Sequence, residues 1–101
     1  MRLTTQEQDA IKDSFRHCFG AQDHLWLFGS RVDDQKRGGD IDLYVETCFD
    51  SKQAIKAEFA FLGMVQDQIG EQKIDLVLNV LPLAYHQPIY QIAKTKGIQL
   101  V

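Results

Sequence analysis

The chain has 101 residues, a formal net charge of −3 at pH 7, 45% hydrophobic residues and 25% charged residues. This size fits a single domain over residues 1–101 with one modest core, and the composition excludes a disordered or fibrous protein. The acidic balance, with Lys36-Arg37 as the only basic cluster, argues against a broad nucleic-acid-binding surface. A polar N-terminus without a long apolar run predicts a cytoplasmic protein with no membrane segment.

The first third of the chain is expected to form a helix and then a buried strand. Thr4 and Glu7 have the spacing of a capping box at the start of a helix that ends before Gly20. The short apolar run 25–28 contains aromatic residues, which favours a buried strand. Residues 30–39 are then expected to form a short helix followed by a turn.

The remaining residues alternate between strand and helix patterns. Segments 40–46 and 73–80 have the two-residue period of half-buried strands. Segment 51–69 has helical periodicity, and segment 88–96 is a last helix, followed by a short closing strand at 98–101. The stripe expected to face the core on the second helix contains Ile55, Phe59, Leu62, Val65 or Gln66, and Ile69. The predicted fold class is α/β (α+β), with a small mixed β-sheet and helices packed on one face.

Three aspartates are expected on the open face of this sheet. Asp40 and Asp42 share the polar face of strand 40–46, and Asp75 lies on the polar face of strand 73–80. The Asp-x-Asp spacing puts two carboxylates about 7 Å apart on one side of a strand. Converging carboxylates repel one another unless a cation lies between them, and Mg²⁺ prefers oxygen ligands. The pattern therefore predicts a site for two Mg²⁺ ions.

The segment after the first strand has features of a phosphate-binding turn. Gly29 allows a close backbone approach to a ligand, and the Ser30 hydroxyl can donate to a terminal phosphate. Ser30 alternatively caps a short helix. Arg31, Lys36 and Arg37 are either phosphate contacts or solvated loop charges. Gly29, Ser30 and Arg31 are the predicted nucleotide-binding residues.

These motifs carry a family resemblance. Phe28-Gly29-Ser30-Arg31-Val32, followed by Asp40-Ile41-Asp42-Leu43, resembles the Gly-Ser…Asp-x-Asp signature of the DNA polymerase β-like nucleotidyltransferase superfamily. The short chain resembles its minimal nucleotidyltransferase (MNT) domains, and the similarity extends over nearly the whole sequence, including Asp75. The resemblance implies the nucleotidyltransferase fold, ATP as substrate, and transfer of AMP to a hydroxyl group. It implies that Asp40 and Asp42 bind both metals, and that Asp75 binds one metal and helps to activate the acceptor.

The resemblance also implies a partner protein. A chain of 101 residues is too short to contain a separate acceptor-binding domain, so a partner or an oligomer must supply one. Many MNT proteins are encoded with a HEPN-domain ribonuclease toxin and act as antitoxins that attach AMP to a tyrosine of that toxin. A helical HEPN-type protein is therefore the expected partner and acceptor.

Two other interpretations stay open. Nine residues separate Ser30 from Asp40, one fewer than is common in similar MNT sequences, and this loop contains the acidic pair Asp33-Asp34. An acidic loop would repel a triphosphate, which favours a catalytically weak or inactive module that neutralises its partner by contact. The intact set of three acids favours activity. The third interpretation is a nucleotidyltransferase subunit that acts on a small molecule.

Other residues on the same strands have weaker functional signals. Tyr44 and Trp26 are candidates for stacking on a base, although the apolar run around Trp26 is typical of a core. Glu46 shares the face of the acids and is expected at its rim. Cys18 and Cys48 lack a paired spacing and are expected to be reduced structural thiols.

Overall fold

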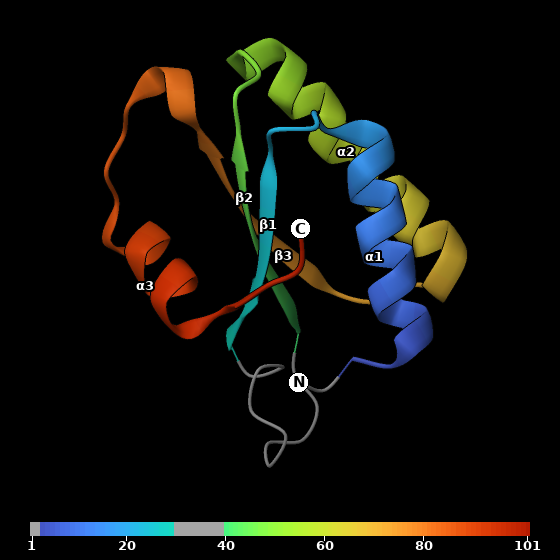
Figure 1. Cartoon of the computed structure of the whole chain (residues 1–101). Coiled ribbons are helices and arrows are strands. Elements are labelled where there is room, and N and C mark those ends of the chain that lie inside the picture. The colour runs from blue at the N-terminus through green and yellow to red at the C-terminus, as the bar shows by residue number, and fades with distance from the viewer. Residues whose placement is uncertain (1–2, 30–39) are drawn as a thin grey trace.

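A computed structural model of the chain describes residues 3–29 and 40–101 (Figure 1). The elements are α1 (Thr5–Cys18), β1 (His24–Phe28), β2 (Ile41–Thr47), α2 (Ser51–Ile69), β3 (Ile74–Val80), the 3₁₀ helix η2 (Leu81–Leu83), α3 (Pro88–Lys96) and β4 (Ile98–Gln99). They confirm the expected α/β class with a small mixed sheet. The short helix and turn expected within 30–39 lie outside the described residues. None of the described helices is long and apolar enough to span a bilayer.

The four strands of the described chain form one sheet in the order β3-β2-β1-β4. β1 is antiparallel to both β2 and β4, whereas β2 and β3 are parallel and are connected through α2. In this register Asp42 pairs with Asp75, and Glu46 pairs with Asn79. Because side chains alternate along a strand, both pairs lie on the same face of the sheet.

Local signals explain where the helices begin and end. The Thr4 hydroxyl accepts from the Glu7 N–H at 3.0 Å, and the Glu7 carboxylate accepts from the Thr4 N–H at 2.9 Å, so the predicted capping box is confirmed. Asp50 caps α2 by accepting from the Gln53 N–H at 2.8 Å. Gly70 follows α2 with a φ of 82°, a left-handed conformation that favours glycine.

The main core lies between the sheet and the helices α1 and α2. Apolar side chains from alternate positions of β1 and β2 pack against the inner faces of both helices. Figure 1 shows α1 and α2 together on one side of the sheet. The largest fully buried members are Ile11, Phe15, Leu25, Leu27, Ile41, Leu43, Val45, Phe61 and Val65. Each such side chain stabilises the fold by about 1.5–3 kcal/mol through burial.

The third helix covers the opposite face of the sheet, so the expectation that all helices pack on one face is wrong for α3. A second core cluster of Trp26, Tyr44 and Ala93 joins β1 and β2 to α3, with Tyr90 packed against it. Figure 1 shows α3 on the side of the sheet away from α1 and α2. The physical reason is that β1 is apolar on both faces, so both faces must be covered.

The apolar stripe expected on α2 is also placed differently. Ile55 is 50% exposed and Phe59 is 70% exposed, whereas Leu62 and Ile69 are partly buried against the core. The buried residues of α2 are Ala54, Ala57, Phe61 and Val65, so Val65 is the only member of the expected stripe that is fully buried. Both sets have helical spacing, and the small alanines allow α2 to lie closer to α1 and the sheet.

Candidate functional site

Two of the three predicted acids come from equivalent positions on neighbouring parallel strands. Asp42 is the second residue of β2 and Asp75 the second residue of β3, and the register pairs them directly. Neighbouring strands lie about 4.8 Å apart, and both side chains point away from α1 and α2. Asp40 lies one residue before β2 and two residues before Asp42, so the two side chains are on the same face of the sheet. The fold therefore brings Asp40, Asp42 and Asp75 to one end of the sheet face.

Gly29 lies beside the central carboxylate of this group. Phe28 pairs with Asp42 across β1 and β2, and Gly29 follows it with a φ of 77°. A Cβ atom built on Gly29 would overlap the Asp42 carboxylate. Glycine is thus required at position 29 for two reasons: its backbone conformation and the space beside Asp42. The other predicted nucleotide-binding residues, Ser30 and Arg31, lie outside the described residues.

The carboxylates disfavour one another's charge. Burial raises the pKa of Asp42, and the nearby charges of Asp75 and Asp40 raise it further, while Lys73 lowers it in part. Asp42 is only partly exposed, so water screens this repulsion incompletely. A bound cation would therefore stabilise the charged forms of these carboxylates.

Lys73 also belongs to this site, although no sequence motif indicates it. Its ammonium Nζ lies 3.3 Å from Asp40 Oδ2, and its side chain is well exposed. The hydrogen bond to Asp40 raises the pKa of Lys73, as do the charges of Asp40, Asp75 and Asp42. Lys73 lies two residues before Asp75, and this strand spacing was the available signal. An exposed lysine is free to exchange a carboxylate for a ligand phosphate.

The donor chemistry of these residues fits magnesium. Within residues 3–29 and 40–101, no three His, Cys, Asp or Glu side chains are arranged to hold a metal ion, so Asp40, Asp42 and Asp75 do not form a three-carboxylate metal site. Mg²⁺ usually binds through one or two carboxylates, with water and substrate phosphates as the other ligands. The all-oxygen set of Asp40, Asp42 and Asp75 matches this requirement, and Gly29 leaves room beside Asp42.

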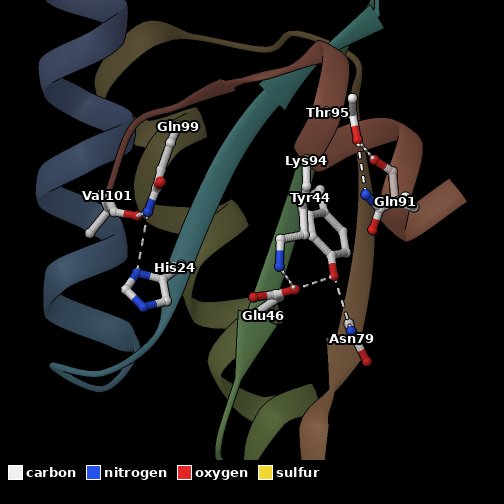
Figure 2. Close-up of polar contacts among 9 residues, drawn as sticks. All are labelled: His24, Tyr44, Glu46, Asn79, Gln91, Lys94, Thr95, Gln99 and Val101. Carbon is white, nitrogen blue, oxygen red and sulfur yellow. Dashed lines mark hydrogen bonds and ion pairs between the residues drawn. The ribbon is translucent and has the colours of Figure 1, made fainter. Parts of the chain in front are cut away.

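The other end of the same face holds a network of hydrogen bonds around Tyr44 (Figure 2). The Tyr44 hydroxyl donates to Glu46 Oε2 at 2.7 Å and accepts from Asn79 Nδ2 at 3.0 Å. Lys94 of α3 forms an ion pair with the same Glu46 oxygen at 3.2 Å. Lys94 Nζ also lies 5.4 Å from the centroid of the Trp26 ring, a cation–π contact.

The network bears on three residues considered in the sequence, namely Tyr44, Trp26 and Glu46. The Tyr44 ring is fully buried between Trp26 and Tyr90, with ring centroids 5.3 and 5.4 Å away, so it has no free face for a base. Burial raises the pKa of Tyr44 well above its usual value. Trp26 is buried, in agreement with the core interpretation. Glu46 was expected at the rim, but its side chain is only 13% exposed because Tyr44 and Lys94 contact it.

A cleft of about 600 Å³ opens beside this network. It is lined by Glu46 and Asn79 from the sheet, by Leu81 and residues 84–87, and by α3 residues as far as Lys94. Clefts of about 300–1,000 Å³ are typical of small-molecule sites. The described face of the sheet therefore has two distinct features, an acidic end and a cleft.

No protein-family model matches this sequence, and no curated protein has significant similarity to it. The resemblance of Gly29-Ser30 and Asp40-Ile41-Asp42 to nucleotidyltransferases thus stays a prediction from those motifs.

Proposed function

We propose that this protein is a Mg²⁺-dependent nucleotidyltransferase, which transfers a nucleoside monophosphate from a nucleoside triphosphate to a hydroxyl group. The observation that carries the proposal is the direct pairing of Asp42 with Asp75 beside Gly29. The raised pKa of Asp42 supports it, since such a carboxylate gains from a neighbouring cation. A purely structural sheet has no need for paired like charges on its open face.

The reaction is an in-line displacement at the α-phosphorus. A bond forms between the acceptor oxygen and this phosphorus, the bond from phosphorus to the bridging oxygen breaks, and pyrophosphate leaves. Asp40, Asp42 and Asp75 would hold Mg²⁺, which when bound neutralises the phosphates and favours ionisation of the acceptor hydroxyl. The exposed Asp75 accepts the acceptor's proton, either directly or through water.

Two further residues assist binding in this proposal. Gly29 lets the phosphate chain pass close to Asp42, because it has no side chain at that position. Lys73 exchanges Asp40 for a phosphate oxygen when the nucleotide enters, since its ion pair with Asp40 is exposed to water and weak. Positioning and electrostatic stabilisation provide most of the catalysis.

The biological form of the proposal follows the family resemblance. The nucleotide is ATP, the acceptor is a tyrosine of a helical HEPN-type toxin, and the protein acts in the cytoplasm as its antitoxin. A protein acceptor agrees with the exposed apolar side chains of Ile55 and Phe59 on α2, which an interface would cover.

The test is a search for a covalent adduct by mass spectrometry. The purified protein, with and without its co-purifying partner, is incubated with Mg²⁺ and each nucleoside triphosphate in turn. We expect one nucleoside monophosphate adduct, reduced at least 100-fold in Asp42→Asn and Asp75→Asn, an effect typical of a lost electrostatic group (~10²–10³). Asp67→Asn, on the exposed side of α2, is the matched control and should leave the adduct unchanged. The absence of any adduct with all four nucleotides would contradict the proposal.

A second function, neutralisation of the partner by contact alone, is favoured by one observation. Lys73 already supplies a positive charge to Asp40, so this end of the sheet has a partial substitute for a metal ion. If neutralisation needs contact alone, the Asp42→Asn variant would still bind and neutralise the partner as fully as the unmodified protein does. Binding measured by calorimetry beside the adduct assay separates the two functions.

A further inference from the structure

The cleft lies on the same sheet face as the acids and within reach of a molecule bound there. Asp42 and Glu46 are four residues apart on β2, and Asp75 and Asn79 have the same separation on β3. Four residues of strand span about 13 Å. A ligand held at the acidic end would therefore extend along the face toward Asn79 and the cleft.

The hydrogen bonds around Tyr44 fix the orientation of the Asn79 amide. The Glu46 carboxylate can only accept, so the Tyr44 hydroxyl donates its single proton to it. The hydroxyl must then accept from Asn79, which places Nδ2 toward Tyr44 and Oδ1 on the opposite side of the amide (Figure 2). The assignment of nitrogen and oxygen in Asn79 thus follows from the donors and acceptors around it.

This arrangement leaves part of a buried amide without a partner. Asn79 is 6% exposed and lines the cleft, and no described residue donates to its Oδ1 atom. Its second Nδ2 hydrogen is also unused among the described residues. A buried acceptor without a protein donor is costly, so a molecule in the cleft that donates to Asn79 Oδ1 would be stabilised there. The Asn79 amide therefore offers the cleft one acceptor and one donor side by side.

The walls of the cleft suit a flat apolar ring. Tyr85 is 62% exposed and Leu81 is 41% exposed, although both line the cleft. Tyr90 also lines the cleft, and its ring is stacked on that of Tyr44. Aromatic side chains of this kind stack on nucleobases whatever the base, so the Asn79 amide would supply the selectivity.

We propose that the cleft binds the adenine ring of the nucleotide and that Asn79 reads its amino edge. Asn79 Oδ1 accepts from the exocyclic amino group, and the second Nδ2 hydrogen donates to the ring nitrogen N7, a pairing that asparagine makes with adenine elsewhere. A 6-oxopurine presents two acceptors at this edge, so its carbonyl oxygen faces Oδ1 and repels it. The identification of the ring as part of a nucleotide rests on the proposed function, whereas the preference for a 6-aminopurine rests on Asn79.

The test uses the unmodified protein without metal. Protein labelled with ¹⁵N is titrated in EDTA with adenosine or with inosine, which carries a carbonyl in place of the amino group. We expect adenosine to shift the side-chain NH₂ signals of Asn79 and the backbone signals of residues 84–91, and to bind about tenfold or more tighter than inosine. Equal binding of the two nucleosides, or no shift at these residues at millimolar adenosine, overturns the proposal.

Three variants assign the binding to the cleft. Asn79→Leu should abolish the preference for adenosine, and the exposed Tyr85→Ala should weaken both nucleosides while leaving the fold intact. The Asp42→Asn/Asp75→Asn double variant should bind adenosine as the unmodified protein does. If only the double variant lost binding, the ring would lie at the acids and the proposal would fail.

The outcomes separate this inference from the proposed function. Selective adenosine binding without any nucleotidyl transfer would support adenine binding in the cleft and contradict the proposed transferase activity. Nucleotidyl transfer from ATP and GTP at equal rates, with no shift of the Asn79 signals, would support the transferase activity and contradict adenine binding in the cleft.

Discussion

The two ends of the sheet face that carries α3 are built from the same two strands, but their electrostatics differ. At the acidic end, Asp42 and Asp75 are paired like charges, and the only described cation nearby is the exposed Lys73. At the tyrosine end, Glu46 has two partners, Tyr44 and Lys94, and α3 covers the network. The hydrogen bonds and the ion pair at the tyrosine end stabilise the sheet, whereas the acidic end is costly unless a ligand supplies positive charge. This difference is typical of a binding site held on a rigid support.

The largest effect is expected from Gly29→Ala, which breaks the acidic end. Alanine would be strained at a φ of 77°, and its Cβ would displace the Asp42 carboxylate. Nucleotidyl transfer should fall about 100-fold or more, since small displacements of catalytic groups have effects of that order. Initial rates of adduct formation measure this loss.

The matched control is Gly63→Ala in the middle of α2, where a new Cβ meets no atom within 4 Å. There alanine should leave the rate unchanged and stabilise the helix by roughly 0.5–1 kcal/mol. A fully active Gly29→Ala variant would show that the space beside Asp42 is not needed.

Tyr44→Phe tests the tyrosine end. The change removes one hydroxyl and leaves the Asn79 amide and Glu46 buried without that partner. The unfolding free energy should fall by about 1–3 kcal/mol, the cost of unsatisfied buried polar groups. Urea denaturation followed by Trp26 fluorescence gives the value, because Trp26 lies 5.3 Å from the Tyr44 ring. A stability equal to that of the unmodified protein would mean that the network does not support the sheet.

Asp42→Asn should raise the unfolding free energy, and by less than Tyr44→Phe lowers it. Burial and the neighbouring acids raise the pKa of Asp42, so the folded protein binds its proton more tightly than the unfolded chain does. The resulting stabilisation is present at low pH and is lost as the pH rises through the folded pKa. At pH 7 without metal, the variant should therefore be more stable, by less than about 1 kcal/mol after solvent screening.

Thermal unfolding in EDTA and in Mg²⁺ measures the Asp42→Asn effect. The advantage of the variant should shrink as the pH falls toward 4, because the unmodified Asp42 is then protonated as well. Mg²⁺ should stabilise the unmodified protein and reverse the order, since a ligand that binds only the folded state raises its stability. A variant that is less stable than the unmodified protein in EDTA would contradict the repulsion.

The smallest effect is expected from Lys73→Ala. Its ion pair with Asp40 is largely exposed, so the melting temperature should not change measurably. The variant should bind Mg²⁺ more tightly in the absence of nucleotide, because Lys73 no longer competes for the Asp40 carboxylate. Calorimetric titration with MgCl₂ tests this, and weaker Mg²⁺ binding would exclude competition by Lys73.

Local patterns in the sequence were enough to find the elements and the acidic end. The alternation around Asp42 and Asp75 predicts two half-buried strands, and the observed bounds of β2 and β3 agree within one residue. Thr4 and Glu7 predict the first helix in the same way. These signals involve residues close in sequence, so the rules of strand alternation and helix capping apply to them directly. The catalytic and metal-binding roles of the three acids stay predictions.

Contacts between distant segments decided the rest. The sequence by itself determined that Asp40, Asp42 and Asp75 would share a polar face, because alternation is a property of each strand alone. Only the tertiary structure placed α3 over Trp26 and Tyr44, left Phe59 exposed, and joined Tyr44 to Asn79, which lies 35 residues later. Such pairings depend on strand register and on which helix covers which face. Both depend on the packing of the whole chain, which no short pattern contains.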